Sequence, residues 1–164
     1  MEILSLLSSL VSLVSDFVLE FKRERILKKE KTRELAEGIL PDLRLLCKEM
    51  QGYVYLNKLE TAEKDNKKYN NITELLNKIR DRYERYSIYL TKDLSFSIDI
   101  ILLGIEKYCN RFTFLKGITQ KDSTGHIPFH LQADVNEKRK IVSVIQKQLP
   151  KRIEAVKQQF SRSI

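Results

Sequence analysis

Residues that break helices are scarce in this chain, which has five Gly and three Pro in 164 residues. With so few breakers, helices should dominate the structure. Cysteine is also rare. Cys47 and Cys109 lie far apart, in no metal or redox spacing, and we expect both to be buried thiols in a reducing compartment. The chain has no Trp, no low-complexity tract and no internal repeat.

Motifs of catalysis and cofactor binding are missing as well. The sequence has no phosphate-binding loop, no Gly-rich dinucleotide fingerprint and no nucleophile-triad order. His126 and His130 are the only histidines, and Pro128 interrupts the loop that contains them. Two histidines without a matching carboxylate or thiolate make a poor metal site. We therefore expect no metal, no cofactor and no enzymatic activity.

Basic residues are absent from the first nineteen positions, MEILSLLSSLVSLVSDFVL, and the next fourteen positions contain seven. No residue from Ile3 to Ser15 is charged. A helix from Ile3 to Leu19 would be roughly 25 Å long, slightly short of the ~30 Å hydrocarbon core of a bilayer. This change from apolar to basic within one helix predicts a membrane helix with a basic collar at the headgroups.

Two faces can be read from the same stretch at helical spacing. Serines form one stripe, which Asp16 continues, and large apolar residues form the other. The first stripe includes Ser5, Ser9, Ser12 and Asp16, and the second includes Leu6, Leu7, Leu10, Val14 and Phe17. Such a helix could lie flat at the membrane interface. It could also span the bilayer in a ring of several copies, with the serines facing a pore. It could also be a packing or oligomerisation helix of a soluble bundle.

Nearly all of the net charge of +8 lies in residues 138–164, which hold eight Lys or Arg and one acid, Glu154. The collar is also rich in cations, but Glu20, Glu24, Glu30 and Glu34 are interleaved with them. A strongly basic helix attracts nucleic acid, anionic lipid or an acidic partner. The predicted headgroup or polyanion contacts are Lys22, Arg23, Arg25, Lys28 and Lys29 in the collar and Lys147, Lys151 and Arg152 in the last helix.

The predicted fold is all-α: a long N-terminal amphipathic or hydrophobic helix, residues 1–37, precedes an antiparallel bundle over 41–164 with about four to five helices in all. Gly38 and Pro41 should end or kink the first helix. Capping boxes are expected to start later helices at Asn71 and at Asp134. The segment 94–115 is apolar nearly all round, which predicts a central position.

A small protein with an N-terminal hydrophobic helix (1–19), a basic stretch (22–33) and a compact bundle from Pro41 resembles the membrane pore-forming accessory protein of type VI-B CRISPR systems. The resemblance implies a divergent HEPN-like domain and a closed homo-oligomer in the bacterial inner membrane, with the C-terminal domain in the cytoplasm. HEPN ribonucleases carry an Arg followed four to six residues later by His. Here Arg111 is not followed by His until His126, which argues against ribonuclease activity.

Two functions from different classes follow. In the first, the protein is a non-enzymatic, homo-oligomeric, pore-forming membrane effector in antiviral defence, whose partners are lipid, itself and an RNA-guided nuclease. In the second, it is a cytoplasmic basic module that binds RNA or a nuclease, with residual ribonuclease chemistry at Arg111 and His126 or His130.

Overall fold

The computed structural model describes residues 2–55, 62–118 and 128–164, with side chains from Leu13 onward except that of Ala62. Every regular element in this part of the chain is a helix, as predicted. The long helices are α1 (Glu2–Val54), α2 (Ala62–Tyr86), α3 (Lys92–Ile118), α4 (Gln132–Ser143) and α5 (Leu149–Ser163). A π-helix, Val144–Gln148, joins α4 to α5, and 3₁₀ turns form at Ser87–Tyr89 and Phe129–Leu131.

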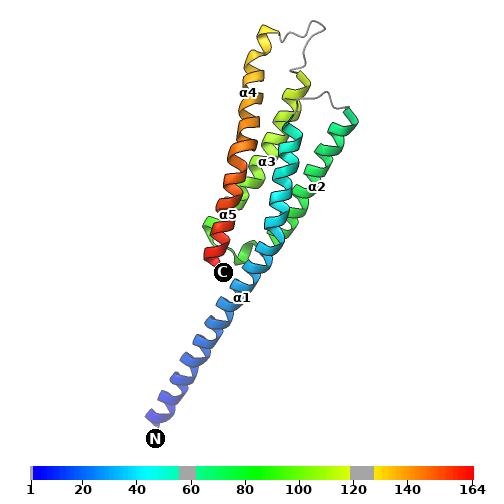
Figure 1. The fold of residues 1–164 in the computed structure, drawn as a ribbon. Coiled ribbons are helices and arrows are strands. Elements are labelled where there is room, and N and C mark those ends of the chain that lie inside the picture. The colour runs from blue at the N-terminus through cyan, green and yellow to red at the C-terminus, as the bar shows by residue number, and fades with distance from the viewer. Residues whose placement is uncertain (1, 56–61, 119–127) are drawn as a thin grey trace.

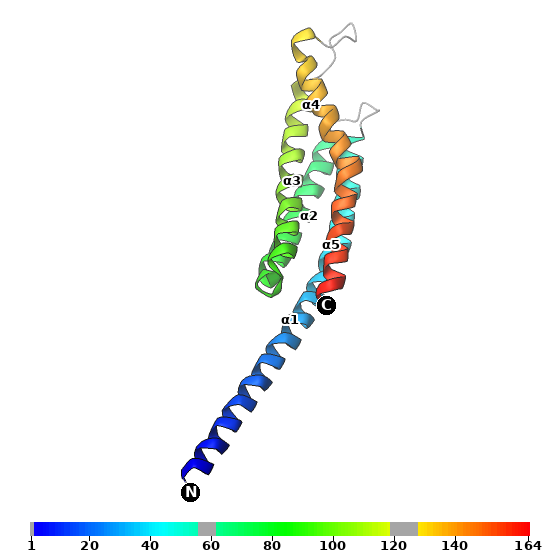
Figure 2. The ribbon, with the colours of Figure 1, turned by 90° about the vertical axis from the view of Figure 1, so that its left-hand side faces the viewer.

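The helices form an up-down-up-down bundle (Figure 1). Within it α1 packs against α2 and α5, while α3 packs against α4, α5 and α2. The α4–α5 segment therefore closes the bundle against both α1 and α3. Figure 2 shows the same arrangement from the side, with the first part of α1 extending far beyond the other helices.

The core follows the apolar stripes of the sequence. On α1, Leu35, Ile39, Leu43 and Leu46 are fully buried at the 3–4 spacing of a helix that buries one face. Similar stripes on the other helices meet them: Ile72 and Ile79 on α2, Leu94, Ile98, Phe112 and Leu115 on α3, and Ile145, Ile153, Val156 and Phe160 on the α4–α5 segment.

The expectation that Gly38 and Pro41 end the first helix is wrong, because α1 continues through both residues to Val54. Pro41 has no amide to donate to the carbonyl of Glu37, four residues earlier. Contacts with α2 hold the helix at this turn, since the guanidinium of Arg82 donates to the Gly38 carbonyl and to Asp42 (2.9 Å). A Cβ at Gly38 would lie 2.7 Å from Nη1 of Arg82, so glycine permits this approach.

Both predicted capping boxes are also wrong. Asn71 lies inside α2, which begins at Ala62. Leu131 precedes α4 and makes no side-chain cap, and Glu137 binds Arg111 of α3 instead of a helix terminus. The capping pattern was present in the sequence, but Glu137 of the second pattern forms an ion pair with Arg111 of α3 and does not cap a helix.

The prediction that α3 lies at the centre of the bundle is only partly right. One face of α3 is buried, but its outer face exposes Phe96 (65%), Leu103 (62%) and Phe114 (55%). In a four-helix bundle each helix has an outer face. The apolar surplus of α3 is therefore surface that the described part of the chain leaves exposed.

Candidate functional site

The most distinctive feature of the molecule is a length mismatch. With 53 residues α1 would be about 80 Å long, whereas α2 and α3, with 25 and 27 residues, would be only about 40 Å long. The shorter helices pack beside the C-terminal part of α1 and leave the N-terminal part unaccompanied (Figure 1). We call residues 13–30 the protruding segment, because every one of them is exposed.

Large apolar side chains are numerous on the protruding segment. Five of them share one face at helical spacing: Leu13 (67% exposed), Val14 (60%), Phe17 (70%), Val18 (44%) and Phe21 (54%). Ser15 and Asp16 point to the opposite side and are also exposed. Leu19 (50%) lies between them, so this side is mixed, whereas the first face is wholly apolar. No element in the described part of the chain covers either side of the helix.

The residues predicted to form a membrane or pore helix fall into two groups. Val14, Asp16 and Phe17 lie on the protruding segment. The others lie on the first turns of α1, where the backbone is helical but the side chains are outside the described part of the chain: Ser5, Leu6, Leu7, Ser9, Leu10 and Ser12.

The predicted basic collar is solvent-exposed at all five positions, Lys22, Arg23, Arg25, Lys28 and Lys29. Arg25 lies over the ring of Phe21 at 5.7 Å from its centroid, a cation–π contact within the helix. The collar thus separates the apolar face from the bundle, and its cations face solvent.

A set of polar contacts fixes the base of the protruding segment to the bundle. Lys31 pairs with Glu34 at 2.8 Å, and the hydroxyl of Tyr86 donates to the same carboxylate. Both contacts lower the pKa of Glu34, with Lys31 as the larger cause. Thr32 donates to the Tyr89 carbonyl at 3.3 Å. Packing of α1 by its own chain begins at these residues.

The second predicted basic group lies on the α4–α5 segment, where Lys147, Lys151 and Arg152 are exposed. Lys147 belongs to the π-helix, and the other two belong to the first turn of α5. No acidic side chain in the described part of the chain pairs with any of the three. These cations therefore remain available to an anionic partner.

The structure does not assemble the residues of the ribonuclease alternative. Arg111 makes a two-pronged ion pair with Glu137, at 2.9 and 2.6 Å, and lies 5.2 Å from the ring centroid of Phe114. The pair raises the pKa of Arg111 and lowers that of Glu137. His130 is exposed on the 3₁₀ turn, with no interaction that joins it to Arg111, and His126 lies outside the described residues.

Both thiols are buried, in agreement with the sequence. Burial raises the pKa of Cys47, and it raises the pKa of Cys109 to about 11. Neither is therefore a thiolate at neutral pH, which is the form that attacks electrophiles or binds metals. In the described residues no group of three or more His, Cys, Asp or Glu side chains is placed to hold a metal ion.

One polar cluster was not anticipated from the sequence. Asp42 is 8% exposed and receives hydrogen bonds from Lys78 and Arg82, each at 2.9 Å. These hydrogen bonds join α1 to α2. No signal in the sequence singles out Asp42, because an acid next to a buried leucine is common.

Over the residues that the structure describes, no helix contains a stretch sufficiently long and apolar to cross a bilayer. Comparison with protein-family models, with curated proteins and with solved structures found no significant match.

Proposed function

We propose that this protein works by assembly at a membrane and not by catalysis: the protruding segments of several copies associate with lipid and with one another. The observation that supports this most is the complete exposure of residues 13–30, with an apolar face that includes Phe17 (70% exposed) and Phe21 (54%). Large exposed apolar patches mark interaction sites with proteins or membranes.

The energetics of an isolated helix support the same proposal. Helices in water gain most of their stability from tertiary packing of an apolar face. The protruding segment has such a face and nothing of its own chain to pack on it. Lipid, a second copy or both would supply the missing burial, worth about 25 cal/mol per Å² of apolar surface.

Of these two partners, lipid and a second copy, the distribution of charge supports lipid. The collar from Lys22 to Lys29 follows the apolar face directly, as expected for a helix whose cations contact anionic headgroups. Ser15 and Asp16, on the opposite side of the helix, would face neighbouring copies or water, because polar groups in a bilayer need such partners. This arrangement gives a closed ring around a polar lumen. The link to antiviral defence stays a prediction from resemblance.

Vesicle binding and leakage test the proposal. We expect the full chain to float with anionic liposomes, to release an entrapped dye, and to give a detergent-solubilised particle several times the mass of one chain. Phe17→Gln combined with Phe21→Gln should abolish flotation. The matched control is Phe96→Gln with Phe129→Gln, which alters two exposed rings outside the protruding segment (65% and 93%) and should float like wild type.

A monomeric particle that shows neither flotation nor leakage at any lipid composition would contradict the proposal. If such a monomer retarded RNA, and if Lys147→Gln with Lys151→Gln removed that binding, the basic binding module would be the better description.

A further inference from the structure

A narrow apolar groove lies between α3 and the α4–α5 segment, far from the protruding segment in sequence. It has two adjoining parts, partly open to solvent. The part beside Gly104 has room for about 20 Å³, and the part beside Ala155 has room for about 230 Å³. Ile100, Ile101 and Arg152 border both parts. We call this feature the α3–α5 groove. Its volume falls slightly below the ~300–1,000 Å³ range of drug-sized small-molecule sites, so only a slender ligand fits.

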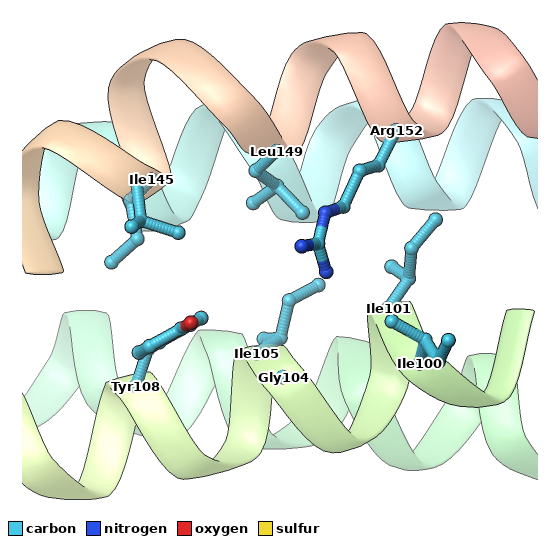
Figure 3. A pocket seen from close by; sticks show the side chains of 9 residues that line it. Ile100, Ile101, Gly104, Ile105, Tyr108, Ile145, Leu149 and Arg152 are labelled. Atoms are coloured by element: carbon cyan, nitrogen blue, oxygen red, sulfur yellow. The ribbon is translucent and has the colours of Figure 1, made fainter. Parts of the chain in front are cut away.

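The walls of the groove are almost entirely aliphatic. Ile101, Ile105, Ile145 and Leu149 form its buried floor, each at most 6% exposed. Gly104 lies on the α3 wall, so that no side chain fills the space there (Figure 3). Such a lining offers a ligand van der Waals contact and apolar burial but very few hydrogen bonds.

One charged side chain interrupts this lining. Figure 3 shows the guanidinium of Arg152 turned from α5 into the space between the two helices, toward α3. In the described part of the chain no carboxylate pairs with Arg152. An unpaired guanidinium at the middle of an apolar groove is suited to an anion, because its planar fork binds carboxylate or phosphate through two hydrogen bonds.

The backbone beside the groove is irregular. Pro150 has no amide to donate, so one α-helical hydrogen bond is missing in the first turn of α5. The Leu149 amide donates to the Val144 carbonyl, five residues earlier, which is the π pattern. Single π turns are rare and frequently occur at functional sites.

We propose that the α3–α5 groove binds an anionic amphiphile, with one alkyl chain along the aliphatic walls and the carboxylate or phosphate head on Arg152. The narrow cross-section and the single cation both favour an alkyl chain over a helix of another protein. This site is separate from the protruding segment, and it would operate whether or not that segment meets a membrane.

Binding of the fluorescent fatty acid cis-parinarate to the full chain tests the proposal. To remove background on α1, the protein carries Phe17→Gln and Phe21→Gln. We expect saturable binding of one molecule per chain below the micelle concentration. Laurate and dodecyl phosphate should both compete, which identifies an anionic head in general, whereas dodecyltrimethylammonium should not compete.

Two substitutions locate the site, each with a matched control. Arg152→Gln should weaken binding roughly tenfold or more, because it removes a charge-assisted pair of hydrogen bonds. Its control, Lys151→Gln, removes the neighbouring cation and should bind normally. Gly104→Leu should block the groove, since a Cβ there meets only Tyr108 at 3.8 Å and the larger side chain extends into the space. Its control is Gly52→Leu, where a Cβ meets nothing within 4 Å.

The proposal would be overturned by three results: no saturable binding, equal competition by the cationic amphiphile, or equal affinity in all four variants. If a groove variant does not fold by circular dichroism, photolabelling of the Phe17→Gln, Phe21→Gln protein with a diazirine fatty acid decides. Labels within 97–108 or 144–156 support the site, and labels confined to α1 contradict it.

Discussion

The two halves of α1 have similar local character but different surroundings. Residues 13–30 include eight large apolar residues that are exposed, whereas from Leu35 to Val54 the apolar stripe is buried almost without interruption. Both halves belong to one continuous helix. The difference arises because α2 and α3, with 25 and 27 residues, are only about half as long as α1, with 53, and α4 and α5 are shorter still. An apolar face is therefore core or interaction surface according to whether a partner helix of the same chain reaches it.

The largest expected difference between the two halves of α1 is in the effect of one acidic side chain placed on each half. Leu43→Asp puts a carboxylate at a fully buried position and should unfold the bundle, since an unpaired buried charge costs several kcal/mol of a typical ~5–15 kcal/mol stability. Val14→Asp, at 60% exposure, should leave the thermal midpoint of the bundle unchanged. Circular dichroism at 222 nm measures both, and similar melting of the two variants would contradict the assignment of the halves.

A smaller effect is expected from the polar junction between α1 and α2. Asp42→Ala removes the acceptor of Lys78 and Arg82 and should cost about 1–3 kcal/mol of unfolding free energy. Asp42→Asn should cost less, because an amide oxygen still accepts a hydrogen bond. The control on the protruding segment, Asp16→Ala, should change stability by no more than about 0.5 kcal/mol. Urea unfolding at neutral pH distinguishes these outcomes, and an effect of Asp42→Ala as small as the control would show that the junction is dispensable.

Acid should weaken the bundle modestly through its exposed ion pairs. Arg80 lowers the pKa of Glu106, and Arg111 lowers that of Glu137, mainly by hydrogen bonding. Because the folded-state pKa values lie below the ordinary value of 4.5, each pair contributes fully above about pH 4.5, and the contribution is lost as pH falls through the lowered values. Both carboxylates are about 40% exposed, so solvent screening keeps the effect small.

Glu106→Gln combined with Glu137→Gln should reduce this acid-dependent loss in urea midpoints measured from pH 7 to pH 3. If the double variant loses as much stability in acid as the wild type, other carboxylates cause the loss.

The smallest effect on stability is expected from removal of the exposed end. A chain without residues 2–20 should unfold at the same temperature as the full chain, because the first buried side chain among those that the structure describes on α1 is Thr32. The same chain should lose flotation with vesicles. A molten truncated protein, without near-UV circular dichroism, would mean that the N-terminal part of α1 contributes to the folded core.

The sequence predicted the helical class well because the apolar residues of α1 and α3 recur at 3–4 spacing over many turns. Leu43, Met50, Ile98 and Phe112 are all buried as the periodicity requires. Helix boundaries were predicted less well. Gly38, Pro41 and Asn71 are local signals for an end or a start, and each was overridden by packing or by a contact such as that of Arg82.

The candidate sites also differ in whether the sequence alone could predict them. The apolar face and the basic collar of α1 were visible in the sequence, since both are patterns within one helix. The α3–α5 groove was not, although Gly104 in an apolar helix and Arg152 in a basic one were each noticeable. A groove requires the relative position of two helices 40 residues apart in the chain, and no periodicity within either helix encodes it.

By itself, then, the sequence determined which residues form helices, which face of each is apolar and where the charges lie, because these depend on spacing of 3.6 residues. The tertiary structure decided that α1 passes unbroken through Pro41, that residues 13–30 have no covering element in the described part of the chain, and that Arg152 faces an open aliphatic groove. Those outcomes depend on the unequal lengths of helices and on contacts between residues distant in sequence, which local chemistry does not specify.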